Sequence, residues 1–334
     1  MDLEGLRIQT IEAHTAGEPL RIIVSGWPEI LGASILDKRR HARRHHDALR
    51  RLLMLEPRGH ADMYGCIPTP PTTEDGDLGV LFLHNAGFST MCGHGIIGLV
   101  TVGLEHGLFK PEDTNDIRID TPAGRVVARA ERQGNRIVRV AFRNVPSFLL
   151  EETSVSVPGI GDVALRLAFG GAFYAYVDAE PLGVPLDASG YAQLVDHGRR
   201  IKRTVEDEIE IAHPEGDEDL GFLYGVIFVG SGRSGGHHRN VCVFADGEVD
   251  RSPTGTGVSG LIAIHHAQGA VRLGESRRIE SILGTSFEVS ALEETTVGSV
   301  PAVVPEVIGS ASVTGRAEFW LDPNDALPEG FLLR

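Results

Sequence analysis

A short motif that occurs twice, half a chain apart, constrains this sequence more than any other feature. Residues 89–95 read STMCGHG and residues 251–257 read RSPTGTG. An apolar run precedes each copy, at 80–83 and at 241–244. The repeat therefore predicts two related halves, each with a strand, a polar turn and a glycine-rich helix start. The matching positions after the turns are Gly93, Gly95, Gly98, Leu99 and Gly107 in one copy, and Gly255, Gly257, Gly260, Leu261 and Gly269 in the other.

The two helix starts predict a binding site for a small carboxylate. Backbone N–H groups at a helix N-terminus lack intrahelical acceptors and bind anions. Cys92 stands at the first start and Thr254 at the second. The positive end of a helix stabilises a thiolate, and a thiolate beside a bound carboxylate can remove the proton from the next carbon. The plain alternative is that Cys92 is a buried cysteine at a helix start.

Three other interpretations fit the sequence less well. Gly93-x-Gly95-x-x-Gly98, with Asp120 downstream, fits a dinucleotide fingerprint, but about eight residues separate it from its strand, whereas a Rossmann turn follows directly. A cysteine hydrolase needs a base. We do not expect the ring of His94 to turn back onto Cys92, which leaves a distant histidine as the candidate base. The adjacent histidine pairs at 45–46, 237–238 and 265–266 point apart, so we expect no metal site.

Length and composition narrow the class of protein. A chain of 334 residues is long for one core, which predicts two domains. The net charge of −15 argues against nucleic acid and anionic membrane as partners. No run reaches the roughly 18 apolar residues of a membrane span, and the acidic opening at 1–4 is no signal peptide, so we expect the cytoplasm. Cys66, Cys92 and Cys242 are too scattered for a disulfide framework or a zinc site.

Periodicity and turn residues give a coarse plan of the elements. The basic island at 38–46 is expected on the solvated face of one helix, and the acidic stretch at 213–219 in an exposed loop. The turn at 122–124 is a candidate crossing between the halves. Expected helices cover 34–53, 92–105 and 190–212, and expected strands cover 7–13, 20–24, 80–84, 117–120, 125–130, 136–142, 172–177, 224–229 and 240–244.

The motifs resemble those of the proline racemase family. The family's Met-Cys-Gly-His is found at 91–94, and its Asp-Arg-Ser-Pro-Cys-Gly-Thr-Gly is found at 250–257 with threonine in place of cysteine. The resemblance extends to 14–19 (HTAGEP) and 58–62 (RGHAD) and covers nearly the whole chain. It implies an α/β (α+β) fold like that of diaminopimelate epimerase, with two pseudo-symmetric halves. Each half would be a curved, mostly antiparallel sheet around a central helix.

The resemblance also implies where the halves and the site lie. We expect residues 1–122 plus about 316–334 in the half that carries Cys92, and 123–315 in the half that carries Thr254. No cofactor or metal is expected. Backbone N–H groups near the helix starts would hold the substrate carboxylate, and Asp250 would bind the ring nitrogen. The resemblance assigns no role to His14, His60, Asp62 or His238. The residues expected to bind substrate are Gly93, His94, Asp250, Gly255 and Thr256.

The threonine at 254 points to a lyase within the family. Racemases use two thiols, one on each face of the substrate, and a threonine hydroxyl is too weak an acid to replace one at neutral pH. The Cys/Thr pair is similar to that of members that dehydrate trans-3-hydroxy-L-proline to Δ1-pyrroline-2-carboxylate. We therefore expect a hydroxyproline hydro-lyase with Cys92 as base and allow a homodimer. The alternatives are a proline racemase or hydroxyproline 2-epimerase, and an inactive carboxylate-binding protein.

Overall fold

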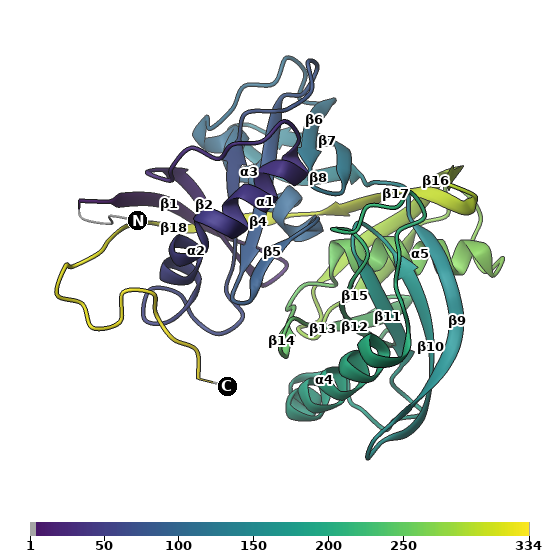
Figure 1. Ribbon diagram of the computed structural model, residues 1–334. Helices are drawn as coiled ribbons and strands as arrows, with labels where there is room; N and C mark the ends of the chain where they lie inside the picture. Colours follow the sequence, from purple (N-terminus) through teal and green to yellow (C-terminus); the bar gives the residue numbers. More distant parts are fainter. Residues whose placement is uncertain (1–4, 334) are drawn as a thin grey trace. The chain divides into compact units, whose positions relative to one another are not determined.

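The structure, a computed structural model, describes residues 5–333 and groups them into two units (Figure 1). Contacts place Met1–Met91, Gly95–Val140 and Ser310–Arg334 in unit 1, and Cys92–His94 with Ala141–Gly309 in unit 2. The acidic residues 1–4, which entered the prediction of a cytoplasmic location, lie outside the described residues. Among residues 5–333, we find no helix with the length and apolar character needed to cross a membrane.

Unit 1 is a mostly antiparallel sheet with three helices. Its helices are α1 (Ile35–His45), α2 (Asp47–Met54) and α3 (Gly93–His106, whose first two residues make their contacts in unit 2). The first eleven residues of α3 are buried, which its glycine-rich and aliphatic sequence allows. The strands are β1 (Arg7–Thr15), β2 (Glu18–Ser25), β3 (Tyr64–Thr69), β4 (Leu78–His84), β5 (Gly87–Ser89), β6 (Ile117–Thr121), β7 (Gly124–Gln133), β8 (Arg136–Arg143, which runs on into unit 2) and β18 (Ala311–Trp320).

Unit 2 carries a helix on each face of its sheet. The sheet curves around α5 (Gly255–Ala267), which packs on β9, β10, β16 and β17, while α4 (Tyr191–Glu208) covers β12 and β13 from the other face (Figure 1). Side chains alternate along β13, so Val241 and Val243 join the core under α4. The strands are β9 (Phe148–Val157), β10 (Gly161–Phe169), β11 (Phe173–Asp178), β12 (Leu223–Ser231), β13 (His238–Phe244), β14 (Glu248–Val249), β15 (Arg277–Glu280), β16 (Ser286–Val297) and β17 (Val300–Gly309), and a short 3-10 turn, η1 (Ala188–Gly190), precedes α4.

Strand pairing shows that the repeat extends over both units. In unit 1 the pairs β1–β2, β3–β4, β4–β5 and β6–β7 are antiparallel, and β2–β3 and β4–β6 are parallel. In unit 2 the pairs β10–β11, β12–β13, β13–β14 and β15–β16 are antiparallel, and β11–β12 and β13–β15 are parallel. The same pairing therefore surrounds each glycine-rich helix, which confirms two related halves.

Each unit is completed by a strand that follows the other unit's strands in the chain. β9 comes after β8 but pairs with β10, and β18 comes after β17 but pairs with β1, where Arg7 faces Trp320. The chain crosses at Val140–Ala141 and at Gly309–Ser310. The turn at 122–124 closes a hairpin in which Thr121 pairs with Gly124, so residues 123–140, which the sequence prediction assigned to the second half, make their contacts in unit 1.

The basic island is less solvated than expected. The predicted single helix is interrupted at His46, which ends α1 and precedes α2. Lys38 and Arg39 are buried, and they donate to the carbonyls of Pro70 (2.7 Å) and Phe88 (2.9 Å). The expectation was wrong for these residues because long cationic side chains can bury their stems when backbone acceptors satisfy their charged ends. The exposed members of the island are Arg40, Arg43, Arg44 and His45.

A buried ion pair supports the loop that joins β12 to β13. Glu280 is 0% exposed, and its carboxylate is 2.8 Å from Arg239 Nη2. Burial by itself would raise the pKa of Glu280. The N–H of Arg233, the Arg239 guanidinium and the N–H groups of Gly236 and Ser234 outweigh burial and lower that pKa to about 2. Glu280 therefore anchors the loop in its ionised form.

Removing this carboxylate charge should destabilise the protein in a pH-dependent way. We expect Glu280→Gln to lower the free energy of unfolding by about 3–5 kcal/mol at neutral pH, because Arg239 stays buried without its counter-ion. The pKa of Glu280 is lowered in the fold, so its stabilisation is complete above the ordinary value of 4.5 and is lost as the pH falls toward 2. Urea unfolding at several pH values should show the difference from wild type shrinking below about pH 4.5.

The matched control for this variant is Glu275→Gln, whose carboxylate pairs with Arg277 at 2.6 Å at the surface. Exposed pairs contribute little, so this variant should unfold like the wild type. Equal effects of the two substitutions would contradict the assignment.

Candidate active site

The two glycine-rich helix starts touch at Gly93 and Gly255. A Cβ placed on either glycine would lie 2.6 Å from the Cα of the other, so neither position has room for a side chain. Cys92 and Thr254, the residues immediately before these glycines, each precede a helix as predicted. Because Cys92–His94 makes its contacts in unit 2, the whole arrangement lies within one unit. The structure therefore brings the two halves of the repeated motif together.

Cys92 has a partner that the sequence interpretation had dismissed. The sulfur of Cys92 lies 3.1 Å from Nδ1 of His94 and 3.8 Å from its Nε2. Both side chains are buried, with exposed fractions of 5% and 3%. The expectation that the His94 ring could not turn back was wrong, because side chains on a helix lean toward its N-terminus, which is where Cys92 lies. The first half of the motif thus holds a thiol–imidazole pair.

Thr254 occupies an unusual position at the start of α5. Its backbone has φ 66° and ψ 97°, a left-handed conformation that is unfavourable for a β-branched residue. Its hydroxyl oxygen is buried and makes no hydrogen bond. Strain and an unsatisfied buried hydroxyl both cost stability, and proteins tolerate them mainly where function requires them. The position therefore indicates a residue whose hydroxyl serves something other than the fold.

The turn before Thr254 is built by two side-chain caps. Asp250 is 6% exposed, and its Oδ1 accepts from the N–H of Ser252 at 2.7 Å. Ser252 Oγ in turn accepts from the N–H of Thr254 at 3.1 Å. One carboxylate oxygen of Asp250 therefore holds the turn that leads to Thr254. Ser252 was not a predicted site residue.

Two tyrosines of β11 hold the first turn of α5 through hydrogen bonds. Tyr174 Oη lies 2.7 Å from the Thr256 hydroxyl, and Tyr176 Oη donates to the carbonyl of Gly257 at 2.8 Å. Thr254 makes no side-chain cap, so the leading N–H groups of the helix stay available for an anion. Sequence reasoning missed both tyrosines, although their alternation along the predicted strand at 172–177 was a usable signal.

Asn144 and Ser259 bind the same turn from another side. Asn144 Nδ2 donates to Ser259 Oγ at 2.9 Å and to the carbonyl of Gly170 at 2.8 Å. Ser259 Oγ donates to the carbonyl of Gly255 at 2.9 Å. The α5 start is therefore held rigidly enough to present its N–H groups in fixed directions.

The histidine and aspartate residues left without roles divide between the units. In unit 1, His14 Nδ1 accepts from the N–H of Gly17 at 3.3 Å, His60 is exposed, and Asp62 is buried with φ 63°. In unit 2, the ring of His238 lies 4.8 Å from that of His265, near the far end of α5. At about 1.5 Å per residue, His265 is roughly 15 Å along the helix from Gly255. His238 is therefore remote from Thr254.

Burial accounts for the titration of these two histidines. Burial is the main reason that the pKa of His238 is lowered and that the pKa of His265 falls to about 4. His238 and His265 meet from different elements, a contact that the sequence did not reveal. Within residues 5–333, no group of three or more histidine, cysteine, aspartate or glutamate side chains is arranged to hold a metal.

Cys66, Cys242 and Arg58 contribute to the fold. Cys66 and Cys242 are fully buried, and burial raises the pKa of the Cys66 thiol, so that residue is unreactive. Arg58, part of the 58–62 motif, pairs with Asp325 at 2.7 Å and donates to the carbonyls of Leu327 and Pro328. It therefore fixes the C-terminal segment onto unit 1.

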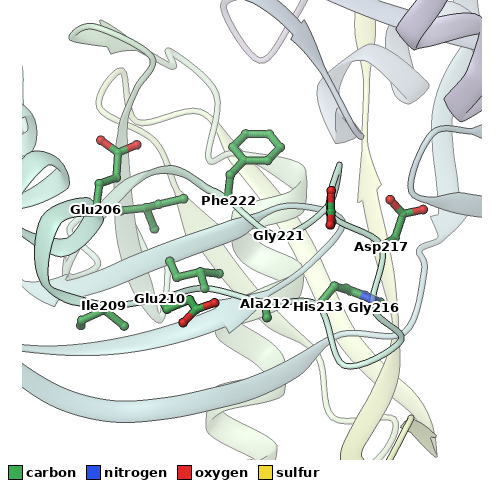
Figure 2. Close-up of a pocket in the computed structure, with 12 residues that line it drawn as sticks. Glu206, Ile209, Glu210, Ala212, His213, Gly216, Asp217, Gly221 and Phe222 are labelled. Atoms are coloured by element: carbon green, nitrogen blue, oxygen red, sulfur yellow. The ribbon is translucent and has the colours of Figure 1, made fainter.

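A pocket of about 450 Å³ lies elsewhere in unit 2, along the segment after α4. Figure 2 shows Glu206, Glu210 and Asp217 among its lining side chains. Neither Cys92 nor Thr254 lines it, and its acidic side chains would repel a carboxylate. The loop at 213–219, which was predicted to be exposed, lines part of this pocket. His213 itself is buried against Phe148, Phe169 and Phe173.

Comparison with known proteins establishes the family. The proline racemase family model matches residues 10–332, so this chain belongs to the proline racemase family. It is 47% identical over 332 residues to the trans-3-hydroxy-L-proline dehydratase of Colwellia psychrerythraea (98% of this chain, 93% of that protein). It is 41% identical over 339 residues to the trans-L-3-hydroxyproline dehydratase of Xenopus tropicalis (99% of this chain, 97% of that protein).

Solved structures confirm the predicted fold class. A crystal structure of a hydroxyproline epimerase from Agrobacterium vitis with bound trans-4-hydroxy-L-proline matches with a TM-score of 0.92 and 29% identity. The match covers 98% of this chain and 96% of that one. A probable proline racemase from Agrobacterium radiobacter with bound carbonate also matches with a TM-score of 0.92, at 31% identity over the same shares of the two chains.

The glycine contact gives a direct test of the site geometry. Gly255→Ala should lower turnover about a hundredfold, because the new methyl group must separate the two helix starts and misplace the reacting groups. Turnover of trans-3-hydroxy-L-proline and the melting temperature would both be measured. Gly315→Ala is the control, since a Cβ there meets nothing within 4 Å. Wild-type turnover in Gly255→Ala would exclude the close contact from catalysis.

Proposed function

We propose that this protein dehydrates trans-3-hydroxy-L-proline to Δ1-pyrroline-2-carboxylate. The observation that carries the proposal is the pairing of one thiol with one hydroxyl: Cys92 and Thr254 precede the two glycines that touch. The dehydratases named in the comparison, at 41–47% identity over nearly the full length, support the same reaction. The reaction is a redox-neutral carbon–oxygen lyase step, so its chemistry requires no oxidant.

One base is sufficient for this substrate. In trans-3-hydroxy-L-proline the α-hydrogen and the 3-hydroxyl lie on the same face of the ring. Cys92 as thiolate removes the α-proton, and the resulting thiol can protonate the departing hydroxyl, which leaves as water. The enamine product tautomerises to the cyclic imine. A second thiol at position 254 would serve inversion, which dehydration does not need.

The helix starts supply the binding groups in this proposal. Leading N–H groups near Gly93, His94, Gly255 and Thr256 hold the carboxylate and the negative charge that develops on it. The Asp250 carboxylate binds the ring nitrogen, and its attachment to the Ser252 N–H keeps it in place. The unpartnered hydroxyl of Thr254 is available to the substrate hydroxyl or to a water.

Composition bears on the partners and the location that we propose for the enzyme. The net charge of −15 supports a small-molecule substrate rather than nucleic acid or an anionic membrane as partner. We place the enzyme in the cytoplasm and allow it to act as a homodimer.

A substrate assay separates this function from its alternatives. The purified protein incubated with trans-3-hydroxy-L-proline should yield the cyclic imine, while the optical rotations of L-proline and 4-hydroxyproline stay unchanged. Loss of rotation without imine would identify a racemase or epimerase. Binding of these ligands without either change would identify an inactive carboxylate-binding protein.

Substitutions at the two motif positions test the division of labour. Cys92→Ser should abolish turnover, because a serine hydroxyl is no base at neutral pH without an activator. Thr254→Ala should retain measurable dehydration, since threonine shapes the site and orients the substrate hydroxyl or a water but transfers no proton in the one-base mechanism. Thr254→Cys should bring some inversion of L-proline, because it restores a second thiol. The readout is solvent deuterium at the α-carbon together with its configuration. Inversion of L-proline by the wild-type protein would refute the one-base mechanism.

A further inference from the structure

A second cavity, of about 420 Å³, lies in unit 1 where two neighbouring strands separate. β2 and β3 run parallel, and only two residues of each strand pair with the other. Beyond Ile22 the strand β2 pairs only with β1, and beyond Cys66 the strand β3 pairs only with β4. The cavity is lined by residues 23–32, by residues 67–70 and by Lys38. It therefore lies between the carboxyl ends of two parallel strands and the segments that leave them.

The position and the lining of this cavity are typical of a small-molecule site. In open sheets, ligands bind in the crevice outside the carboxyl ends of parallel strands, where the connecting segments part. A volume of about 420 Å³ is within the range of such sites, about 300–1,000 Å³. The lining consists mainly of aliphatic residues, three prolines and Trp27. Leu31, also in the lining, is 56% exposed, so the cavity opens to solvent.

Lys38 places a cation in this apolar wall. Its side chain belongs to a residue that is 7% exposed, and its Nζ donates to the carbonyl of Pro70, another lining residue, at 2.7 Å. An ammonium group has three N–H donors, and this carbonyl accepts one of them. Among residues 5–333, no carboxylate lies within ion-pair distance of Lys38 Nζ. Burial lowers the pKa of Lys38, as expected for a cation that no carboxylate contacts.

The acidic residues around Lys38 have other roles. Asp120, whose charge acts on Lys38 from a longer range, pairs with Arg125 at 2.8 Å. Asp37 caps the start of α1, and Glu29, the acidic residue of the lining, is exposed. A buried cation is stabilised most by an anion in direct contact. The charge of this cavity is therefore complementary to an anionic ligand.

We propose that this cavity binds an apolar monocarboxylate, with the carboxylate against Lys38 and the apolar chain between β2 and β3. The ligand differs from the substrate of the proposed function, which carries an ammonium group and a hydroxyl. Here the wall would repel a second cation and would leave a hydroxyl without a partner, so it selects a carboxylate on an otherwise apolar molecule. The proposal does not depend on the dehydratase reaction.

Trp27 provides a reporter inside the proposed site. The chain has two tryptophans, and Trp320→Phe leaves Trp27 as the single one. Trp320 is 61% exposed, so its replacement should leave the fold intact. In this reporter protein, Trp27 fluorescence would be titrated at neutral pH with octanoate as the probe. Octanamide, which has the same chain without the charge, is the matched control ligand.

The expected result is a preference for the charged ligand that depends on Lys38. Octanoate should change the fluorescence saturably and bind about tenfold more tightly than octanamide, because it accepts a charge-assisted hydrogen bond. Lys38→Met keeps the apolar stem and removes the charge. It should weaken octanoate about tenfold and leave octanamide unchanged. Lys110→Met, at an exposed lysine, should bind both ligands as the reporter protein does.

Three results would overturn the proposal. Octanoate that produces no saturable change would show that the cavity does not take this class of ligand. Equal affinities for octanoate and octanamide would show that the cation makes no contact with the carboxylate. A preference for octanoate that survives Lys38→Met would place the carboxylate beside another group. The first two results come from the reporter protein with Lys38 intact, so they stand whether or not Lys38→Met folds, which its melting temperature would report.

Discussion

The backbone contact between Gly93 and Gly255 is the constraint on which the candidate site depends. It brings two helix starts so close that a single methyl group would separate them. The contact permits only glycine at both positions, and it places Cys92 and Thr254, the residues before these glycines, beside the same pair of helix N-termini. Much of the surrounding polar structure of unit 2 then serves to hold this contact, through Tyr174, Tyr176 and the Asn144–Ser259 pair.

The two copies of the motif have diverged in chemistry while keeping their backbone plan. The first carries a thiol with an imidazole beside it, and both are buried. The second carries a strained threonine whose hydroxyl has no hydrogen-bond partner. Ser252 accepts a hydrogen bond from the N–H of this threonine, and Asp250 accepts one from the N–H of Ser252. The two copies keep the same arrangement of strand, turn and helix start, and their side chains make the two sides of the candidate site unequal. This inequality suits the proposed mechanism, in which bonds break on only one face of the ring.

The repeat was readable from the sequence because glycine spacing and apolar runs are local signals. It predicted the helix starts at Cys92 and Thr254 and the strands before them, and the resemblance to the proline racemase family implied the fold class. Contacts between distant segments were not readable in this way. Local signals did not predict β9 and β10, and they did not show that the turn at 122–124 closes a hairpin within unit 1. The burial of Lys38 likewise depends on a carbonyl 32 residues away. The ring of His94 was misjudged because its orientation depends on how a side chain leans at a helix end.

Because the first strand pairs with the last, β1 cannot complete its pairing until nearly the whole chain has been synthesised. β1 is made first, yet its partner β18 follows it by some 300 residues, with Arg7 opposite Trp320. At the usual pace of translation the ribosome needs roughly 15–60 s to cover that distance. Throughout this interval one edge of β1 offers unpaired N–H and C=O groups to any other strand. The nascent chain must therefore be shielded at its beginning until its end has emerged, and a frameshift or early stop near the C-terminus would damage the first-made part of the molecule.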